Sequence, residues 1–228
     1  MPEPAPRFTA ETLRFLRALK RHNRREWFQP RKARYEVCVR APMLAIIDRL
    51  ALDLRQFAPE IVVDPKSSMY RIYRDTRFSE DKTPYKTHVA ASFPWRGLPK
   101  HEGAGLYFHV APTELWIGGG LYAPPTQVLQ AVREHIASNA RTLRSIVESA
   151  SFQRTIGGLD GEQLHRVPRG FPKDHEAADF LKYRQFLAGR EYPTALAVSG
   201  RFYGTLLAVF REVAPLVRFL NEPLSGRP

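Results

Sequence analysis

The chain has 228 residues, of which 43% are hydrophobic and 25% charged, a composition typical of a folded protein rather than a disordered one. No stretch approaches the ~18 consecutive apolar residues of a membrane span, and the single cysteine, Cys38, excludes an intramolecular disulfide. The 35 Lys and Arg residues against 23 Asp and Glu residues give a formal net charge of +12, which favours a partner that carries phosphate or carboxylate groups. An arginine-rich but merely solvated surface is the alternative explanation.

Two helical segments are predicted before the first strand. Thr9 is placed to cap a helix that ends near residues 22–23. A second helix is expected to start at Pro30 and to continue with apolar residues at helical spacing to about Phe57. Pro42 should kink or divide it, because proline lacks a backbone N–H.

The middle of the chain reads as a set of strands. Residues 67–74 are rich in β-forming side chains, and a polar loop at 75–84 follows them. Further strands are expected at residues 88–93, 105–110 and 114–117. The Gly, Asn and Pro residues between them indicate an antiparallel meander.

The remainder is predicted to be helical again, with helices at residues 126–149, 174–181 and 199–220. Helices, then strands, then helices indicate an α+β fold, with a mostly antiparallel central sheet flanked by N-terminal and C-terminal helices. One domain is expected over residues 8–222, with short tails at 1–7 and 223–228.

One block holds the densest polar chemistry of the chain. Its candidate ligand-binding residues are Arg71, Tyr73, Arg74, Asp75, Arg77, Ser79, Asp81, Lys82, Tyr85 and Lys86. Preordered guanidinium groups suit bidentate recognition of a phosphate or carboxylate. An Arg–Asp lattice that pins a loop, with no ligand, would show the same residues.

Roles within the block follow from side-chain chemistry. Three arginines would clamp the anion, two lysines would add charge, and two tyrosines would donate hydrogen bonds or carry protons: Arg71, Arg74 and Arg77, then Lys82 and Lys86, then Tyr73 and Tyr85. Asp75 and Asp81 are expected to orient the clamp, since nearby arginines lower the pKa of a carboxyl group and make it a poor base. No catalytic residue is assigned.

Residues 71–86 read RIYRDTRFSEDKTPYK. This stretch resembles the signature of an uncharacterised, mainly bacterial family known as a domain of unknown function, with the pattern R-x-Y-R-D-x-R-F-S-x-D-K-x-P-Y-K. Segments at 15–28, 118–122 and 168–175 are similar to the same family. The resemblance implies no established activity. A shared polar block in a loop nevertheless indicates a functional site more readily than packing.

Weaker signals lie elsewhere. Residues 118–120 are three consecutive glycines, which indicate a bulge or tight turn, or else amides that hold an anion. His88 and His109 fall on predicted strands and could converge beside the basic block, and His175 follows a helix-start aspartate. The histidines lack metal-ligand spacing, so no metal and no cofactor is expected.

The leading hypothesis is a pocket that binds a small phosphate- or carboxylate-bearing ligand through residues 71–86, with or without catalysis. The alternative is a nucleic-acid-binding protein that uses the first 100 residues, which carry 21 basic and 11 acidic groups. A third reading is a structural module in which the block is only an ion-pair network. A cytoplasmic location and no membrane partner are expected.

Overall fold

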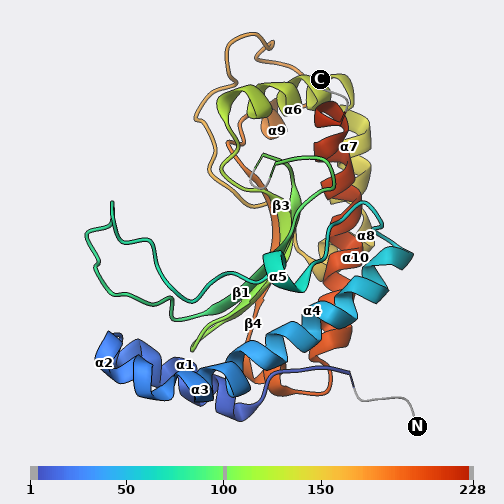
Figure 1. Ribbon diagram of the computed structural model, residues 1–228. Helices are drawn as coiled ribbons and strands as arrows, with labels where there is room; N and C mark the ends of the chain where they lie inside the picture. The colour runs from blue at the N-terminus through green and yellow to red at the C-terminus, as the bar shows by residue number, and fades with distance from the viewer. Residues whose placement is uncertain (1–4, 100–101, 226–228) are drawn as a thin grey trace.

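The computed structural model of the chain describes residues 5–99 and 102–225, so the outer parts of the two expected tails, 1–4 and 226–228, lie outside the described residues. A four-stranded antiparallel sheet in the order β1-β2-β3-β4 lies between N-terminal and C-terminal helices (Figure 1). The predicted α+β class, with an antiparallel sheet and helices on either side of it in the chain, is confirmed.

Helix α1 (Ala10–Arg21) begins where its cap predicts. Thr9 and Thr12 form a capping box, in which each side chain accepts a hydrogen bond from the other residue's backbone N–H. Leu16 and Leu19 are fully buried on the inner face of this helix. The local sequence therefore determines both the start of α1 and the face that it buries.

The second predicted helix is a series of shorter turns: α2 (Arg25–Phe28), η1 (Gln29–Arg31), α3 (Lys32–Tyr35), η2 (Glu36–Arg40), α4 (Ala41–Asp53) and η3 (Leu54–Gln56). The predicted division at Pro42 is confirmed. Pro42 lies in the first turn of α4, and η2, immediately before it, is a wide π-type turn. A wide turn accommodates the proline because its ring would clash with the carbonyl of residue i−4 in a regular helix.

The sheet consists of β1 (Val89–Phe93), β2 (Gly105–Val110), β3 (Leu115–Leu121) and β4 (Phe186–Tyr192), each paired antiparallel with the next. The first three match predicted strands. Strand β4 was not predicted, because its second half, from Gly189 on, is polar and largely accessible. A strand of this kind lacks the apolar alternation on which strand prediction depends.

The strand predicted at residues 67–74 is wrong. This segment begins inside a single helical turn, α5 (Pro65–Ser68), and then makes only isolated bridges, the first between Met69 and Ala91 of β1. Proline is favoured in the first turn of a helix, which explains why this turn forms despite the β-forming residues after it.

Residues 71–86 form an arm that projects away from the sheet between α5 and β1 (Figure 1). The two sides of the arm pair at its base, where Tyr73 and Tyr85 form an isolated bridge. Nearer the sheet, the Lys86 N–H donates to the Ile72 carbonyl at 2.8 Å. The arm is therefore anchored at its base, and its outer part extends into solvent.

Helices follow the sheet and also separate β3 from β4: α6 (Thr126–Ser138), α7 (Ala140–Val147), α8 (Ala150–Thr155), α9 (Ala178–Leu181), η4 (Thr194–Val198), α10 (Phe202–Asn221) and η5 (Glu222–Leu224). The helix predicted over 126–149 is divided at Asn139, which leaves the helical conformation and donates from its side chain to the His135 carbonyl at 2.9 Å. In the part of the chain that is described, no helix is both long and apolar enough to cross a bilayer.

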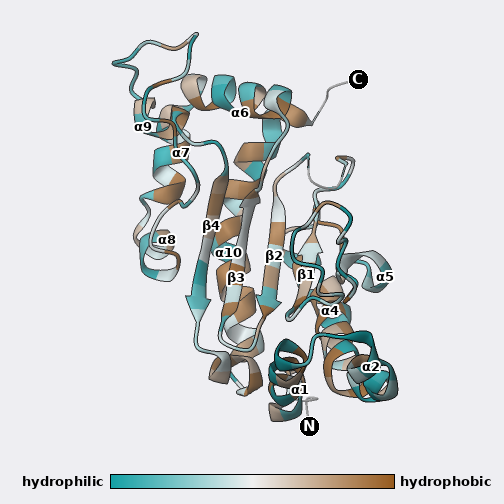
Figure 2. Cartoon of the chain, turned by 90° about the vertical axis from the view of Figure 1, so that its left-hand side faces the viewer, coloured by the Kyte–Doolittle hydropathy of each residue, from teal (hydrophilic) through white to brown (hydrophobic). Residues whose placement is uncertain are grey.

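Helix α10 covers one face of the sheet, as the brown apolar residues behind the strands in Figure 2 indicate. Phe108 of β2 contacts Phe202 and Phe210 of α10, with ring centres 6.1 and 6.5 Å apart. Side chains alternate along a strand, so Tyr107 and His109 point to the opposite face. That second face is left open by α10 and lies beside the arm.

Candidate functional site

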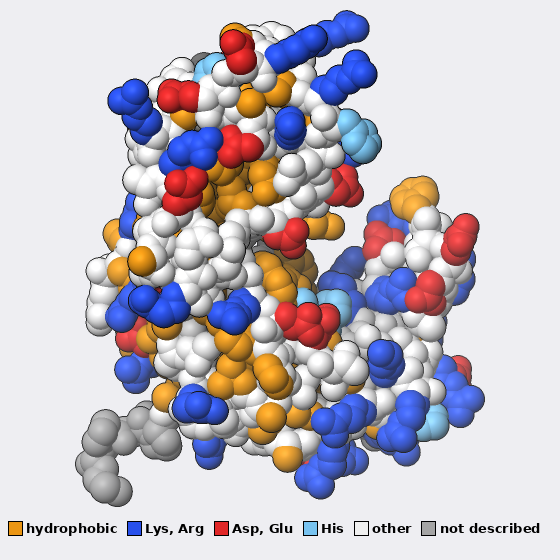
Figure 3. All heavy atoms as spheres, turned by 180° about the vertical axis from the view of Figure 1, so that it is seen from behind, with side chains coloured by type: hydrophobic (Ala, Val, Ile, Leu, Met, Phe, Trp, Pro, Cys, Tyr) orange, Lys and Arg blue, Asp and Glu red, His pale blue; other side chains and the backbone are white. Residues whose placement is uncertain are grey.

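A cleft of about 520 Å³ lies on the open face of the sheet, beside the base of the arm. Figure 3 shows it from behind as a hollow between the arm and the body of the molecule, with hydrophobic and histidine side chains visible inside. The lining comes from the first three strands and the loop residues next to them, from the residues where the arm leaves and rejoins the body, and from Leu187 of β4.

The register of the sheet places the cleft residues side by side. His109 of β2 stands opposite Ala90 of β1 and Trp116 of β3. One step along the sheet, Tyr107 stands opposite Ser92. Cross-strand neighbours on one face are close enough for their side chains to interact, so this register assembles the cleft from residues far apart in the sequence.

Glycines leave space for the Trp116 ring on the open face of the sheet. The bulge or tight turn predicted at residues 118–120 is wrong, because all three glycines lie within β3. A Cβ atom on Gly118 would lie 2.7 Å from the Trp116 ring, and one on Gly189 of β4 would lie 2.3 Å from it. The indole therefore occupies the space that two side chains would fill.

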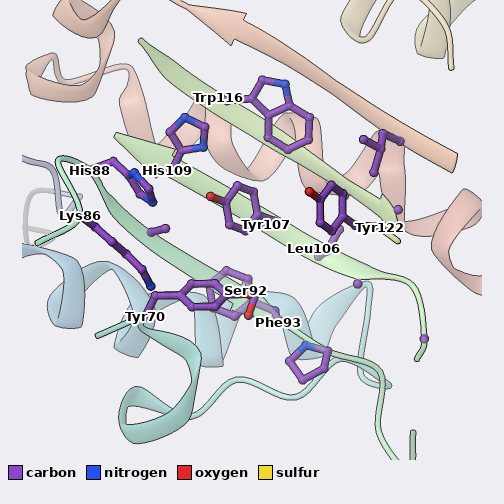
Figure 4. Close-up of a pocket in the computed structure, with 17 residues that line it drawn as sticks. Tyr70, Lys86, His88, Ser92, Phe93, Leu106, Tyr107, His109, Trp116 and Tyr122 are labelled. Atoms are coloured by element: carbon purple, nitrogen blue, oxygen red, sulfur yellow. The ribbon is translucent and has the colours of Figure 1, made fainter. Parts of the chain in front are cut away.

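Aromatic rings form the walls of the cleft (Figure 4). The Tyr107 ring centre lies 6.3 Å from that of Tyr70 and 5.9 Å from that of Trp116. Tyr122, which is 68% exposed, lies at the rim. Burial raises the pKa of Tyr107, so its hydroxyl keeps its proton and remains a hydrogen-bond donor.

Lys86 lines the cleft and contributes a positive charge to it. Its Nζ lies 4.9 Å from the centre of the Tyr70 ring. Burial, together with the nearby His109 and Lys86, lowers the pKa of the neighbouring His88 to about 4 despite the opposing effect of Glu114, so His88 is neutral at pH 7. No Asp or Glu is found among the described residues that line the cleft.

A carboxylate outside the lining positions His109. The Glu114 Oε1 atom lies 3.0 Å from His109 Nε2. Within the described structure, His109 Nδ1 and Ser92 Oγ are both buried without a hydrogen-bond partner. The described residues include no group of three or more His, Cys, Asp or Glu side chains placed to hold a metal ion.

All ten predicted site residues lie in the arm, and four of them form two ion pairs with one another. Arg74 forms an ion pair with Asp81 and also donates to Thr83, with Ser79 at 3.4 Å. The hydrogen bond from Arg74 and those from Thr83 hold the pKa of Asp81 at about 2. This carboxylate therefore stays ionised.

The outer part of the arm repeats this pattern. Arg77 pairs with Asp75 at 2.8 Å, and its hydrogen bonds lower the pKa of Asp75 to about 2. Lys82 donates to the Thr76 carbonyl at 2.9 Å. Phe78 is 96% exposed and has the Arg77 guanidinium 5.8 Å from its ring centre.

The tyrosines of the block have different environments. Tyr85 is buried and stacks on Phe28 of α2 with ring centres 4.2 Å apart, while Asn23 bonds both backbone groups of Tyr85. Tyr73 and Arg71 are both exposed. Tyr85 thus anchors the arm to the N-terminal helices.

A second, smaller hollow of about 320 Å³ lies at the arm base and is lined by Arg25, Gln29, Tyr73, Arg74, Thr76, Pro84 and Tyr85. Of the ten predicted residues, this hollow takes three and the large cleft takes Lys86 alone. His88 and His109 line the cleft as well, whereas His175 accepts from the Ala177 N–H at 3.0 Å and is not among the lining residues.

The aromatic lining residues were missed from the sequence. Tyr107 and Trp116 sit on strands, where an aromatic residue normally indicates core packing. Only their alternation with the buried residues of the same strands points to the other face of the sheet.

The family model described as conserved hypothetical protein (DUF2461) matches residues 11–219. The chain belongs to this family. The match starts in α1 and ends in α10, so it spans the residues of both the arm and the cleft. The predicted membership of an uncharacterised family is confirmed, and the family description assigns no activity. A comparison with curated proteins gives no match.

Proposed function

We propose that the protein binds a small organic anion in the cleft on the open face of the sheet. The phosphate or carboxylate group of the ligand contacts Lys86, and the rest of the ligand lies against the aromatic walls. The observation that carries this proposal is the placement of the Lys86 ammonium group inside a cleft of about 520 Å³, with its Nζ 4.9 Å from the centre of the Tyr70 ring.

The electrostatics of the cleft support an anionic ligand. Burial is the largest cause of the low pKa of His88, and the neighbouring His109 and Lys86 lower this pKa further against the opposing effect of Glu114. A charge in a partly apolar cleft is less screened than one on an open surface, so Lys86 attracts an anion more strongly there. The volume of about 520 Å³ suits a ligand of the size that protein pockets usually hold.

The arm has a supporting role in this proposal. Its arginines and lysines, including Arg71 and Lys82, raise the positive potential along the approach to the cleft and steer anions toward it. Arg74 stiffens the arm through its pair with Asp81 and so helps to position Lys86 at the arm base.

Thermal-shift and calorimetric titrations with benzoate, phenyl phosphate and inorganic phosphate test the proposal. Lys86→Met should weaken binding of the organic anions by at least about tenfold, since it removes a charge-assisted contact worth about 1.5–3 kcal/mol. Lys20→Met, which removes an exposed lysine of α1, is the matched control and should bind as the wild type does. Equal binding by the Lys86 variant would contradict the proposal.

A DNA or RNA oligomer in the same titrations addresses nucleic-acid binding. A protein that neutralises several phosphates releases counterions and loses affinity steeply as salt rises. Binding of one small anion depends far less on salt. Stabilisation by oligomers only, lost in moderate salt, would replace the small-anion proposal with the nucleic-acid one.

A further inference from the structure

We infer that the ligand of the cleft carries a planar aromatic ring in addition to its anionic group, so that the ligand class is aromatic acids or aryl phosphates. The inference rests on the proposed anion site at Lys86. It specifies the chemical nature of the rest of the ligand, which does not contact Lys86. It comes from the floor and the walls of the cleft, which are separate features of the structure.

The floor of the cleft is a sheet surface with few side chains. Gly105 of β2 pairs with Gly120 of β3, and both line the cleft. A Cβ atom on Gly120 would lie 2.0 Å from the Phe186 carbonyl oxygen, and the φ angle of Gly120 is +128°, so this position requires glycine. Bare backbone over neighbouring strands offers a flat surface on which a flat molecule can lie.

The wall next to this floor is the indole of Trp116. Its Cζ2 and Cη2 atoms lie where side chains of Gly118 and Gly189 would otherwise stand, so the ring rests close to the sheet. Gly118 and Gly189 are paired across β3 and β4. Because these two paired glycines have no side chains, the Trp116 ring can pack directly on the backbone of β3 and β4. A large aromatic surface therefore lies beside the floor of the cleft.

Other rings continue this surface around the cleft. Tyr107 meets Tyr70 at an interplanar angle of 68° and Trp116 at 51°, so neighbouring rings of the cleft are steeply inclined to one another. Tyr122 lies beside them at the rim, with most of its surface exposed (Figure 4). Aromatic rings pair with each other in offset-stacked or edge-to-face geometry, and a ligand ring placed here can adopt both.

The anion site and the rings are close enough for one small molecule. Lys86 Nζ lies 4.9 Å from the Tyr70 ring centre, and Tyr70 is the ring that faces Tyr107. A carboxylate attached directly to an aromatic ring can therefore contact Lys86 while its ring contacts the tyrosines. An aliphatic acid of the same charge would keep the first contact and lose the stacking.

The experiment compares matched ligands of equal charge and similar size on the full chain. Benzoate is paired with cyclohexanecarboxylate, and phenyl phosphate with cyclohexyl phosphate, so that within each pair only the planarity and π character of the ring change. Calorimetry should give a dissociation constant about tenfold lower for each aromatic member, which is about 1.4 kcal/mol. Equal or tighter binding of the cyclohexyl members would overturn the inference.

Substitutions of the aromatic cleft residues test which rings produce the preference for aromatic over cyclohexyl ligands. Trp116→Leu should abolish the aromatic preference while Lys86 still binds both acids of each pair. Because Trp116 fills the space above two glycines and its loss can unsettle the sheet, Tyr122→Leu at the exposed rim serves as a second variant, with an expected two- to threefold loss of preference. Tyr192→Leu replaces a β4 tyrosine that does not line the cleft and should keep the preference. A preference unchanged in both Trp116→Leu and Tyr122→Leu would also overturn the inference.

The two proposals fail in different ways. If aromatic and cyclohexyl acids bind equally well and both depend on Lys86, the anion site stands and the aromatic ligand class is wrong. If neither member of either pair binds the wild-type protein, the anion site is wrong and the inference falls with it.

Discussion

Charged residues have different surroundings in the arm and on the open face of the sheet. In the arm, Arg74 pairs with Asp81 and Arg77 pairs with Asp75, so the densest charges of the chain mostly satisfy one another. At the open face of the sheet, Lys86 lines a cleft together with aromatic rings, and its Nζ lies 4.9 Å from the centre of the Tyr70 ring. The difference teaches that the number of charges in a sequence block says less about ligand binding than the surroundings of each charge do.

The largest effect is expected from a substitution that detaches the arm from the body of the protein. Tyr85→Ala removes a fully buried ring that stacks on Phe28, and we expect it to lower the free energy of unfolding by about 3–5 kcal/mol. Tyr85→Phe keeps the ring and should cost less than about 1.5 kcal/mol. Urea denaturation measures both. A small effect of Tyr85→Ala would show that the arm is held by other contacts.

Acid should weaken the sheet face through His88. The unfolded chain binds a proton at this histidine near the ordinary histidine pKa of 6.5, whereas the folded protein binds it only near pH 4. Stability is therefore lost as the pH falls from about 6.5 to about 4, by at most about 3 kcal/mol, and less to the extent that water reaches the ring. His88→Gln should flatten this part of the pH–stability curve. An identical curve for the variant would contradict the buried, neutral state.

The arm's ion pairs should matter much less. Arg74→Ala breaks the pair with Asp81, whose carboxylate side chain is 56% exposed, so we expect the Tm to fall by no more than about 3 °C. Asp81→Asn should give a similar small shift, and high salt should reduce the difference between either variant and the wild type. A loss large enough to unfold the protein would indicate that the pair stabilises the whole fold.

The smallest effect is expected at the far end of the arm. Phe78 is 96% exposed, so Phe78→Ser should leave the Tm and the binding of benzoate unchanged within error. Differential scanning fluorimetry and calorimetry check both quantities. A clear loss of binding would place the end of the arm in contact with the ligand and remove the distinction drawn between the two regions.

The sequence predicted the parts of the fold that local chemistry determines. Thr9 marks the start of α1, and Pro42 marks the division before α4, because capping and the missing N–H of proline act within one helical turn. Strand β4 escaped prediction because Gly189 and the polar residues after it lack apolar alternation. Its place in the sheet depends on pairing with β3, which is not a local property.

The candidate site was predicted only in part for the same reason. Lys86 and the histidines stand out as titratable groups in a sequence, whereas Tyr107 and Trp116 read as core residues on strands. They become the walls of a cleft because the register sets them beside His109 and because helix α10 covers only the other face. The pairing within the arm likewise depends on how residues 71–86 fold back on themselves.

The construction of the arm also determines where the chain can be altered. Its base is held by the Tyr73–Tyr85 bridge and by the burial of Tyr85, and the exposed segment around Phe78 lies beyond these contacts. Exposed loop ends are where proteolytic cleavage and insertions are best tolerated. A peptide tag or a fluorescent label introduced next to Phe78 would therefore lie away from the sheet, and cleavage after Arg77 would yield two fragments that the anchored base still keeps together.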